Sequence, residues 1–190
     1  KNYPELYFLN YVLFHRTNDE EIKPCRTYFW KKIKDKVQGK AMVEAALEIN
    51  HWCAGEVMYQ GTDMRTGSAL EIYRSGVGRC GEAAVFVVNV MRSAGIPARP
   101  VYVPRWYHCD DNHAWVEVWC DGDWHYLGDC EPGAVLDKGG FTNATSRAMM
   151  IGSRWYDRAM PDEKVIGKDG AVRDLTLELN GVTEAEKKVL

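Results

Sequence analysis

Residues 75–86 read SGVGRCGEAAVF and combine a glycine-rich turn with the start of an apolar run. Cys80 stands between Gly78 and Gly81, at the point where that run begins. The run CGEAAVFVVNVMRSAG is apolar on nearly every side, which predicts a helix buried on most of its circumference. Gly95 is a natural C-cap for it. The stretch therefore predicts a cysteine in the first turn of a central helix.

A cysteine in that position has two interpretations. The N-terminus of a helix favours negative charge because its backbone N–H groups are unpaired, so it lowers the pKa of a thiol placed there. The flanking glycines leave room for a substrate carbonyl, and the N–H of Cys80 could donate to an oxyanion, with Gly81 as a further lining or oxyanion residue. The alternative is a buried structural cysteine at a tight turn.

The chain after Pro97 alternates in a way typical of β-strands. ARPVYVP and HAWVEVW show a period of two, and WHYLGD follows an Asp-Gly turn. Upstream of Cys80 the spacing is helical, so we expect helices over 3–21 and 40–58, a short helix after Pro24 and another at SALEIYRSG. Helices followed by an antiparallel meander predict an α+β fold.

A second candidate for the site lies in DDNHAWVEVW, residues 110–119, where His113 opens a strand after a polar loop. A nucleophilic cysteine needs a base that is close in space rather than in sequence. The alternative is a partly exposed structural histidine. We take His113 as a candidate general base and Asn112 beside it as a lining residue.

The third candidate is Asp129 in WHYLGDCEP, residues 124–132, and its position depends on the hairpin register. If Asp121 and Gly122 form a two-residue loop, the residue numbers of cross-strand partners sum to 243. Asp129 then lies opposite Ala114, on the face of the hairpin that does not carry His113. A three-residue loop with Gly122 in a G1 bulge makes the sums 242, and His113 then faces Asp129 directly. In that second register the carboxylate could fix the imidazole tautomer and stabilise the imidazolium, so it is our prediction.

The predicted faces of this hairpin also assign the aromatic residues. Trp115 shares a face with His113 and is the best candidate to shield the thiolate and the imidazole. One face carries His113, Trp115, Glu117, Trp119, Asp123, His125, Leu127 and Asp129, and the other carries Ala114, Val116, Val118, Trp124, Tyr126 and Gly128.

Taken together, GRCGEAAVF, GIPARPVYV, NHAWVEVW and DGDWHYLGDCEP resemble the core of the transglutaminase-like superfamily, which includes tissue transglutaminases, peptide N-glycanases and many bacterial domains. The resemblance covers residues 68–132, with GRCGE particularly similar to peptide N-glycanases. It implies a papain-like fold in which a nucleophile helix packs on an antiparallel sheet. It also implies Cys80 as nucleophile, His113 as general base and acid, and Asp129 as the orienting carboxylate.

The chain departs from these relatives in two ways. Peptide N-glycanases, which the chain resembles at GRCGE, carry paired Cys-x-x-Cys zinc ligands before the nucleophile. This chain has no such pair, which argues against that activity. Bacterial relatives vary at the third triad position, so Glu131 is a fallback partner for His113. The loop HCDDNH, residues 108–113, could be read as a metal loop, but its spacing matches no familiar zinc motif, and we expect neither metal nor cofactor.

The composition of the chain limits which other classes of protein it could belong to. The chain has 190 residues, a net charge of −3 and 46% hydrophobic residues, with no basic block that would indicate nucleic acid. No stretch approaches the ~20 apolar residues of a membrane span. Six cysteines include no Cys-x-x-Cys pair, and one disulfide among Cys109, Cys120 and Cys130 is conceivable in an extracellular protein.

We expect three segments along the chain: a helical part at 1–67 that belongs to the same domain, a catalytic core at 68–160 and a C-terminal extension at 161–190. The extension contains AVRDLTLELNG, which resembles a strand without an evident partner and suggests the start of a following β module. Because the chain begins at Lys1 rather than at a methionine, we expect a preceding signal peptide or domain and a secreted or cell-surface protein.

These features predict an enzyme of thiol-dependent acyl chemistry on amide bonds, most simply a hydrolase of a peptide or protein substrate, including a glycan-linked one. Two alternatives stay open. One is a protein cross-linking transglutaminase. The other is a non-catalytic transglutaminase-like binding module of a larger surface protein, in which Cys80 would be unreactive.

Overall fold

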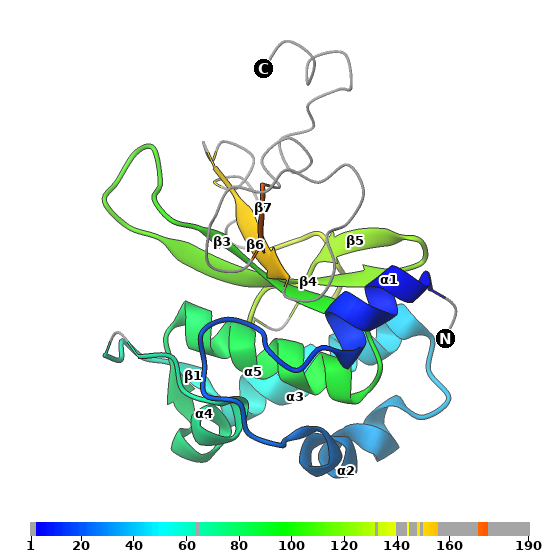
Figure 1. Cartoon of the computed structure of the whole chain (residues 1–190). Helices are drawn as coiled ribbons and strands as arrows, with labels where there is room; N and C mark the ends of the chain where they lie inside the picture. The colour runs from blue at the N-terminus through cyan, green and yellow to red at the C-terminus, as the bar shows by residue number, and fades with distance from the viewer. Residues whose placement is uncertain are drawn as a thin grey trace, which may run out of the picture.

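The protein has a layer of helices packed against one face of a twisted antiparallel sheet (Figure 1). The computed structural model describes residues 3–63, 65–131, 133–139, 144, 148, 150–155 and 171–174. Helix and antiparallel sheet are thus combined in one α+β unit, as the sequence predicts. None of the helices in the described part of the chain is long and apolar enough to cross a bilayer.

The helical layer is built around α5 (Cys80–Ser93), which contacts β3 and β4 on one side and α2, α3 and α4 on the other. The helices before it are α1 (Glu5–Phe8), the π-helix η1 (Leu9–Leu13), α2 (Arg26–Val37), α3 (Met42–Glu56) and α4 (Ala69–Ser75). Eleven of the fourteen residues of α5 are buried, as its apolar sequence predicts. It forms the centre of the main core together with apolar side chains of α2, α3 and the strands.

The first helix is shorter than predicted. A helix over 3–21 was expected, but α1 and η1 together end at Leu13. Phe14 takes an extended conformation, and the polar residues after it fold around Glu20, whose carboxylate accepts the backbone N–H groups of Thr17 and Asn18. These local side-chain bonds compete with helix continuation.

The main sheet has the order β5-β4-β3-β6-β7 with antiparallel neighbours throughout. Its strands are β3 (Ala98–Val103), β4 (His113–Cys120), β5 (Asp123–Tyr126), β6 (Gly152–Trp155) and β7 (Ala171–Asp174). A second, two-stranded parallel sheet pairs β1 (Met58–Tyr59) with β2 (Val77–Gly78), immediately before α5. β4 lies between β5 and β3, packs against α5, and carries His113 at its first position.

The hairpin register differs from the predicted one. In the β4–β5 pair, Cys120 lies opposite Asp123 and Trp119 opposite Trp124, so paired positions sum to 243 rather than 242. Asp121 (φ 53°) and Gly122 (φ 101°) both adopt positive φ. A two-residue loop with two positive φ angles matches strand twist, so the Asp-Gly sequence forms the short loop rather than a G1 bulge.

The correct register exchanges the faces predicted for β5. Leu127 packs in the main core with Val116 and Val118, and Tyr126 packs with Trp115 in a second core on the other side of the sheet. On that side Arg99 and Glu117, both 1% exposed, form a buried ion pair of 2.6 Å. The Arg99 guanidinium also lies 3.9 Å from the ring centroid of Trp124, which this register places on the same face.

The C-terminal part contributes two strands to the same sheet. The segment AVRD, predicted as a strand without a partner, is β7 and pairs with β6. β6, within the predicted catalytic core at 68–160, is a strand that the sequence patterns did not predict. The rest of the predicted 161–190 extension lies outside the described residues, so a following β module stays a prediction.

Candidate active site

Cys80 is the first residue of α5 and is half-buried. Gly76 ends α4 in the left-handed region (φ 69°), and β2 then leads the chain directly into the new helix. Because β1 pairs with β2, the turn before Cys80 is held on one side by the sheet and on the other by α5. The predicted helix start at Cys80 is therefore correct.

The pKa of the Cys80 thiol is raised, contrary to the sequence-based expectation. Burial is the largest cause, and the nearby Asp129 charge also raises it. Hydrogen bonds from the backbone N–H groups of Ala114 and Gly81, and the Arg79 charge, favour the thiolate but do not outweigh burial. The helix N-terminus and β4 therefore each supply one donor to the sulfur, while the resting group remains a thiol.

His113 lies at the first position of β4, paired with Val103 of β3. Its ring is stacked with two indoles, with centroid distances of 6.4 Å to Trp106 and 6.1 Å to Trp115. Burial lowers the pKa of His113 to about 4, although the charge of Asp111 opposes the shift. The imidazole is neutral at pH 7 and is able to accept a proton.

Asp129 lies beyond the end of β5, so it reaches the site by a route different from the predicted strand pairing. The last bond of the ladder joins the N–H of Leu127 to the carbonyl of Val116, at 2.9 Å. Gly128 (φ 80°) and Cys130 (φ 55°) then turn the chain. Asp129 is 8% exposed, and burial, followed by the charge of Glu131, raises its pKa.

A cavity of about 490 Å³ brings the predicted residues together. Cys80, His113, Asp129 and Glu131 all line it, and so does Asn112. Cys80, Asn112 and His113 also line a smaller cavity of about 220 Å³, together with Gly81. The thiol and the imidazole are thus accessible from both hollows, as a binding site for a small-molecule or peptide group requires.

Two tryptophans pack beside His113, and only one of them lines a cavity. Trp115, the predicted one, is stacked with His113 but is fully buried in the second core and lines neither cavity. Trp106, from the loop after β3, is also stacked with His113 and lines the larger cavity. Trp115 supports the imidazole from inside the fold, and Trp106 covers it on the cavity side.

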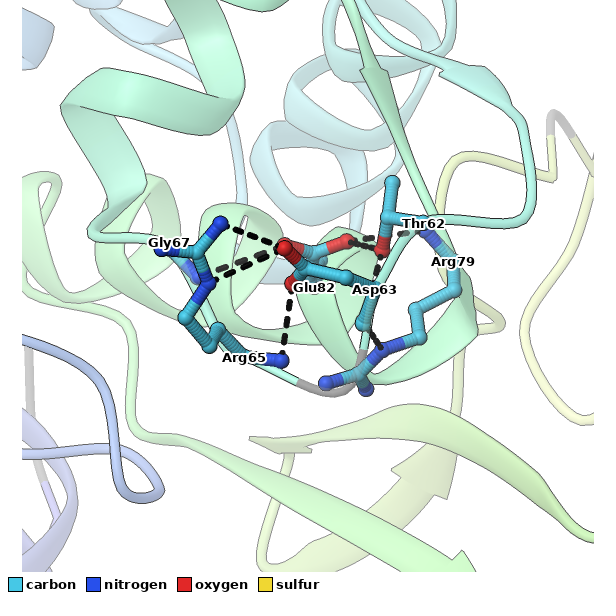
Figure 2. Close-up of polar contacts among 6 residues, drawn as sticks. All are labelled: Thr62, Asp63, Arg65, Gly67, Arg79 and Glu82. Atoms are coloured by element: carbon cyan, nitrogen blue, oxygen red, sulfur yellow. Dashed lines mark hydrogen bonds and ion pairs between the residues drawn. The ribbon is translucent and has the colours of Figure 1, made fainter.

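Glu82 is a site-supporting residue that sequence reasoning missed (Figure 2). Its buried carboxylate accepts hydrogen bonds from Thr62 Oγ1 (2.5 Å), the Gly67 N–H (3.2 Å) and the Arg79 N–H (3.2 Å). The Arg79 side chain in turn donates to the Asp63 carbonyl. Glu82 therefore ties the loop at the cavity rim to the first turn of α5, and the available signal was an acidic residue three positions after the N-cap.

The proposed metal loop does not gather ligands in the described part of the chain, where no three His, Cys, Asp or Glu side chains converge. His108 packs beside the ring of Trp106, and Cys109 is exposed. All six cysteines fall within the described residues and are free thiols. The conceivable disulfide among Cys109, Cys120 and Cys130 is thus absent from the structure.

The chain matches one known protein family. Residues 31–128, just over half of the chain, match the transglutaminase-like superfamily. The chain belongs to this superfamily. A comparison with curated proteins found no match. The matched segment of this transglutaminase-like chain begins within α2 and ends at Gly128, so it contains Cys80 and His113, while Asp129 and Glu131 follow directly.

Two solved structures are similar to this transglutaminase-like protein. A candidate protease from Parabacteroides distasonis has a TM-score of 0.50 at 17% identity, covering 67% of this chain and 25% of that chain. A candidate cysteine protease from Cytophaga hutchinsonii has a TM-score of 0.46 at 18% identity, covering 79% of this chain and 57% of that chain. This chain spans a little over half of one of these proteins and a quarter of the other.

Proposed function

We propose that this transglutaminase-like domain is a cysteine-dependent hydrolase of peptide or peptide-linked amides, with Cys80 as nucleophile, His113 as general base and acid, and Asp129 as the orienting carboxylate. One observation carries the proposal: the three side chains come from a helix start, a strand start and a turn, yet line one cavity. Separate structural roles for three such residues would not require them to meet there.

The protonation states favour attack by general-base catalysis. His113, neutral at pH 7, takes the proton of the Cys80 thiol as the sulfur bonds to the amide carbonyl carbon. The backbone N–H groups of Cys80 and Gly81, at the open end of α5, are the donors available to the oxyanion. The imidazolium then protonates the departing amine, which leaves a thioester on Cys80.

Deacylation completes the cycle. Water attacks the thioester carbonyl while His113 accepts its proton, and the imidazolium returns a proton to the leaving thiolate. Asp129 stabilises the imidazolium in both halves, and the positive charge formed beside it offsets the cost of a buried carboxylate. We propose water as acceptor because Asp111, Thr62 and Glu131 on the lining of the larger cavity are polar groups able to bind it.

A library of peptide aminocoumarin amides tests the proposal, with and without a dansylated diamine as competing acceptor. We expect wild-type protein and Cys109→Ala, which lacks an exposed thiol outside the cavity, to release fluorophore and free peptide acid. Cys80→Ala and His113→Ala should be inactive.

Three results would contradict it. Release of fluorophore by Cys80→Ala would exclude Cys80 as the nucleophile. Formation of the diamine adduct as the sole peptide product would show that the protein is a transamidase. No turnover together with no acylation of Cys80 by p-nitrophenyl acetate would favour a non-catalytic binding module.

A further inference from the structure

The turn that carries Asp129 has an anchor in α3. β5 ends at Tyr126, and the next residues form no further strand pairs in the described chain. The Asn50 side-chain nitrogen Nδ2 lies 3.3 Å from the carbonyl oxygen of Leu127 and 2.8 Å from that of Glu131. These two residues lie two positions before and two positions after Asp129, so a single amide group bridges both ends of the turn.

The burial of Asn50 shows that these bonds matter to the fold. The side chain is 1% exposed, on the face of α3 that also buries Ala46, Ile49 and Cys53. A polar group buried among apolar residues costs free energy unless it is hydrogen-bonded. Its Oδ1 atom is buried and has no hydrogen-bond partner among the described residues, so the NH₂ donors are what the fold uses.

The chemistry of the bridge restricts which residue can make it. A primary amide supplies two N–H donors from one nitrogen, which is what two carbonyl oxygens on either side of a turn require. A hydroxyl supplies one donor, and an ionised carboxylate supplies none and would repel both carbonyls. Gly128 at positive φ and the bridging amide both constrain the backbone of the turn that carries Asp129.

We propose that Asn50 is a positioning residue of the active site, which acts through the turn at 127–131 to hold Asp129 on the lining of the cavity that it shares with Cys80 and His113. This inference rests on the proposed function, because it gives Asn50 a role only if Asp129 has one. Asn50 lines neither of the two cavities at the Cys80 thiol, so its effect on the reacting atoms is transmitted through the turn.

A double-mutant cycle on Cys80 acylation by p-nitrophenyl acetate tests the inference, with acetylated Cys80 quantified by mass spectrometry. Asn50→Leu, close in size but without donors, should lower the acylation rate by about 100-fold, the effect of a reacting group displaced by about 1 Å. In an Asp129→Ala background the same substitution should change the rate less than about twofold. A residue with only a structural role would lower the rate by the same factor in both backgrounds.

Asn89→Leu is the matched control. Asn89 is a second buried asparagine, on α5, whose Nδ2 bonds to Thr17 Oγ1 (3.1 Å) and the Val85 carbonyl (2.9 Å), away from the turn. It should lose stability with little change in acylation. Asn50→Gln, which keeps both donors, should recover part of the rate. If Asn50→Leu does not fold, Asn50→Ser, with one short donor, takes its place in the cycle.

The outcomes separate the two proposals. If Asp129→Ala lowers the rate but Asn50→Leu does not, or if Asn50→Leu acts equally in both backgrounds, the positioning role is wrong and the triad stands. If Asp129→Ala leaves the rate unchanged, the role of Asp129 and that of Asn50 are both overturned.

Discussion

The rate at which Cys80 is alkylated should rise steeply with pH between 5 and 8. Iodoacetamide offers no carbonyl for general-base attack and alkylates only the thiolate, and below the thiol pKa the thiolate fraction falls tenfold for each pH unit. Burial raises the pKa of Cys80 above its ordinary value, so the whole interval lies on that slope. The expected increase from pH 5 to pH 8 is about 1000-fold.

A thiolate–imidazolium pair at rest predicts a different curve. A thiol whose pKa had been lowered to about 5, as the helix start alone suggests, would be at least half ionised throughout the interval and would react at a nearly constant rate. The slope does not depend on how accessible the half-buried sulfur is, because accessibility scales every point equally. The curve therefore discriminates between the two protonation states of the site.

The assay is iodoacetamide labelling at substoichiometric reagent, with peptide mass spectrometry following Cys80 and the exposed Cys109 separately. Cys80→Ser confirms the assignment of the labelled peptide, and circular dichroism confirms that the protein stays folded at each pH. His113→Ala should leave the slope unchanged. A flat profile below pH 7 that becomes steep in His113→Ala would refute the reasoning, since it requires a preformed ion pair.

Two further predictions concern the base and the helix start. The rate of Cys80 acylation, corrected for reagent hydrolysis, should decrease with falling pH only near pH 4, because the lowered pKa of His113 keeps the base neutral above that value. A fall in the acylation rate with its midpoint near pH 6.5, in protein that stays folded, would contradict this. Glu82→Gln should lower the free energy of unfolding in urea by about 1 to 3 kcal/mol, the range for hydrogen bonds to a buried charged group. Glu44→Gln, at the equivalent but exposed position of α3, should cost less than about 1 kcal/mol, and equal losses would show that burial of the Glu82 network contributes nothing.

Local sequence determined the elements that carry the first two site residues. The apolar run at residues 83–88 favours a buried helix, and the glycines before it place Cys80 in the first turn. Alternation in HAWVEVW likewise favours a strand beginning at His113. Both signals lie within one segment of the chain and do not depend on what the partner element is.

Only the tertiary structure decided the protonation of the site and the place of Asp129. Burial opposes the helix N-terminus at Cys80, and the number of atoms that cover a thiol is not a property of its own segment. Asp129 meets the cavity although the register that was meant to bring it there is wrong, because the chain leaves the strand at Gly128 and is bonded by Asn50 from a helix 77 and 81 residues away in sequence. Contacts between such distant segments carry no local periodicity, so no pattern within either segment predicts them.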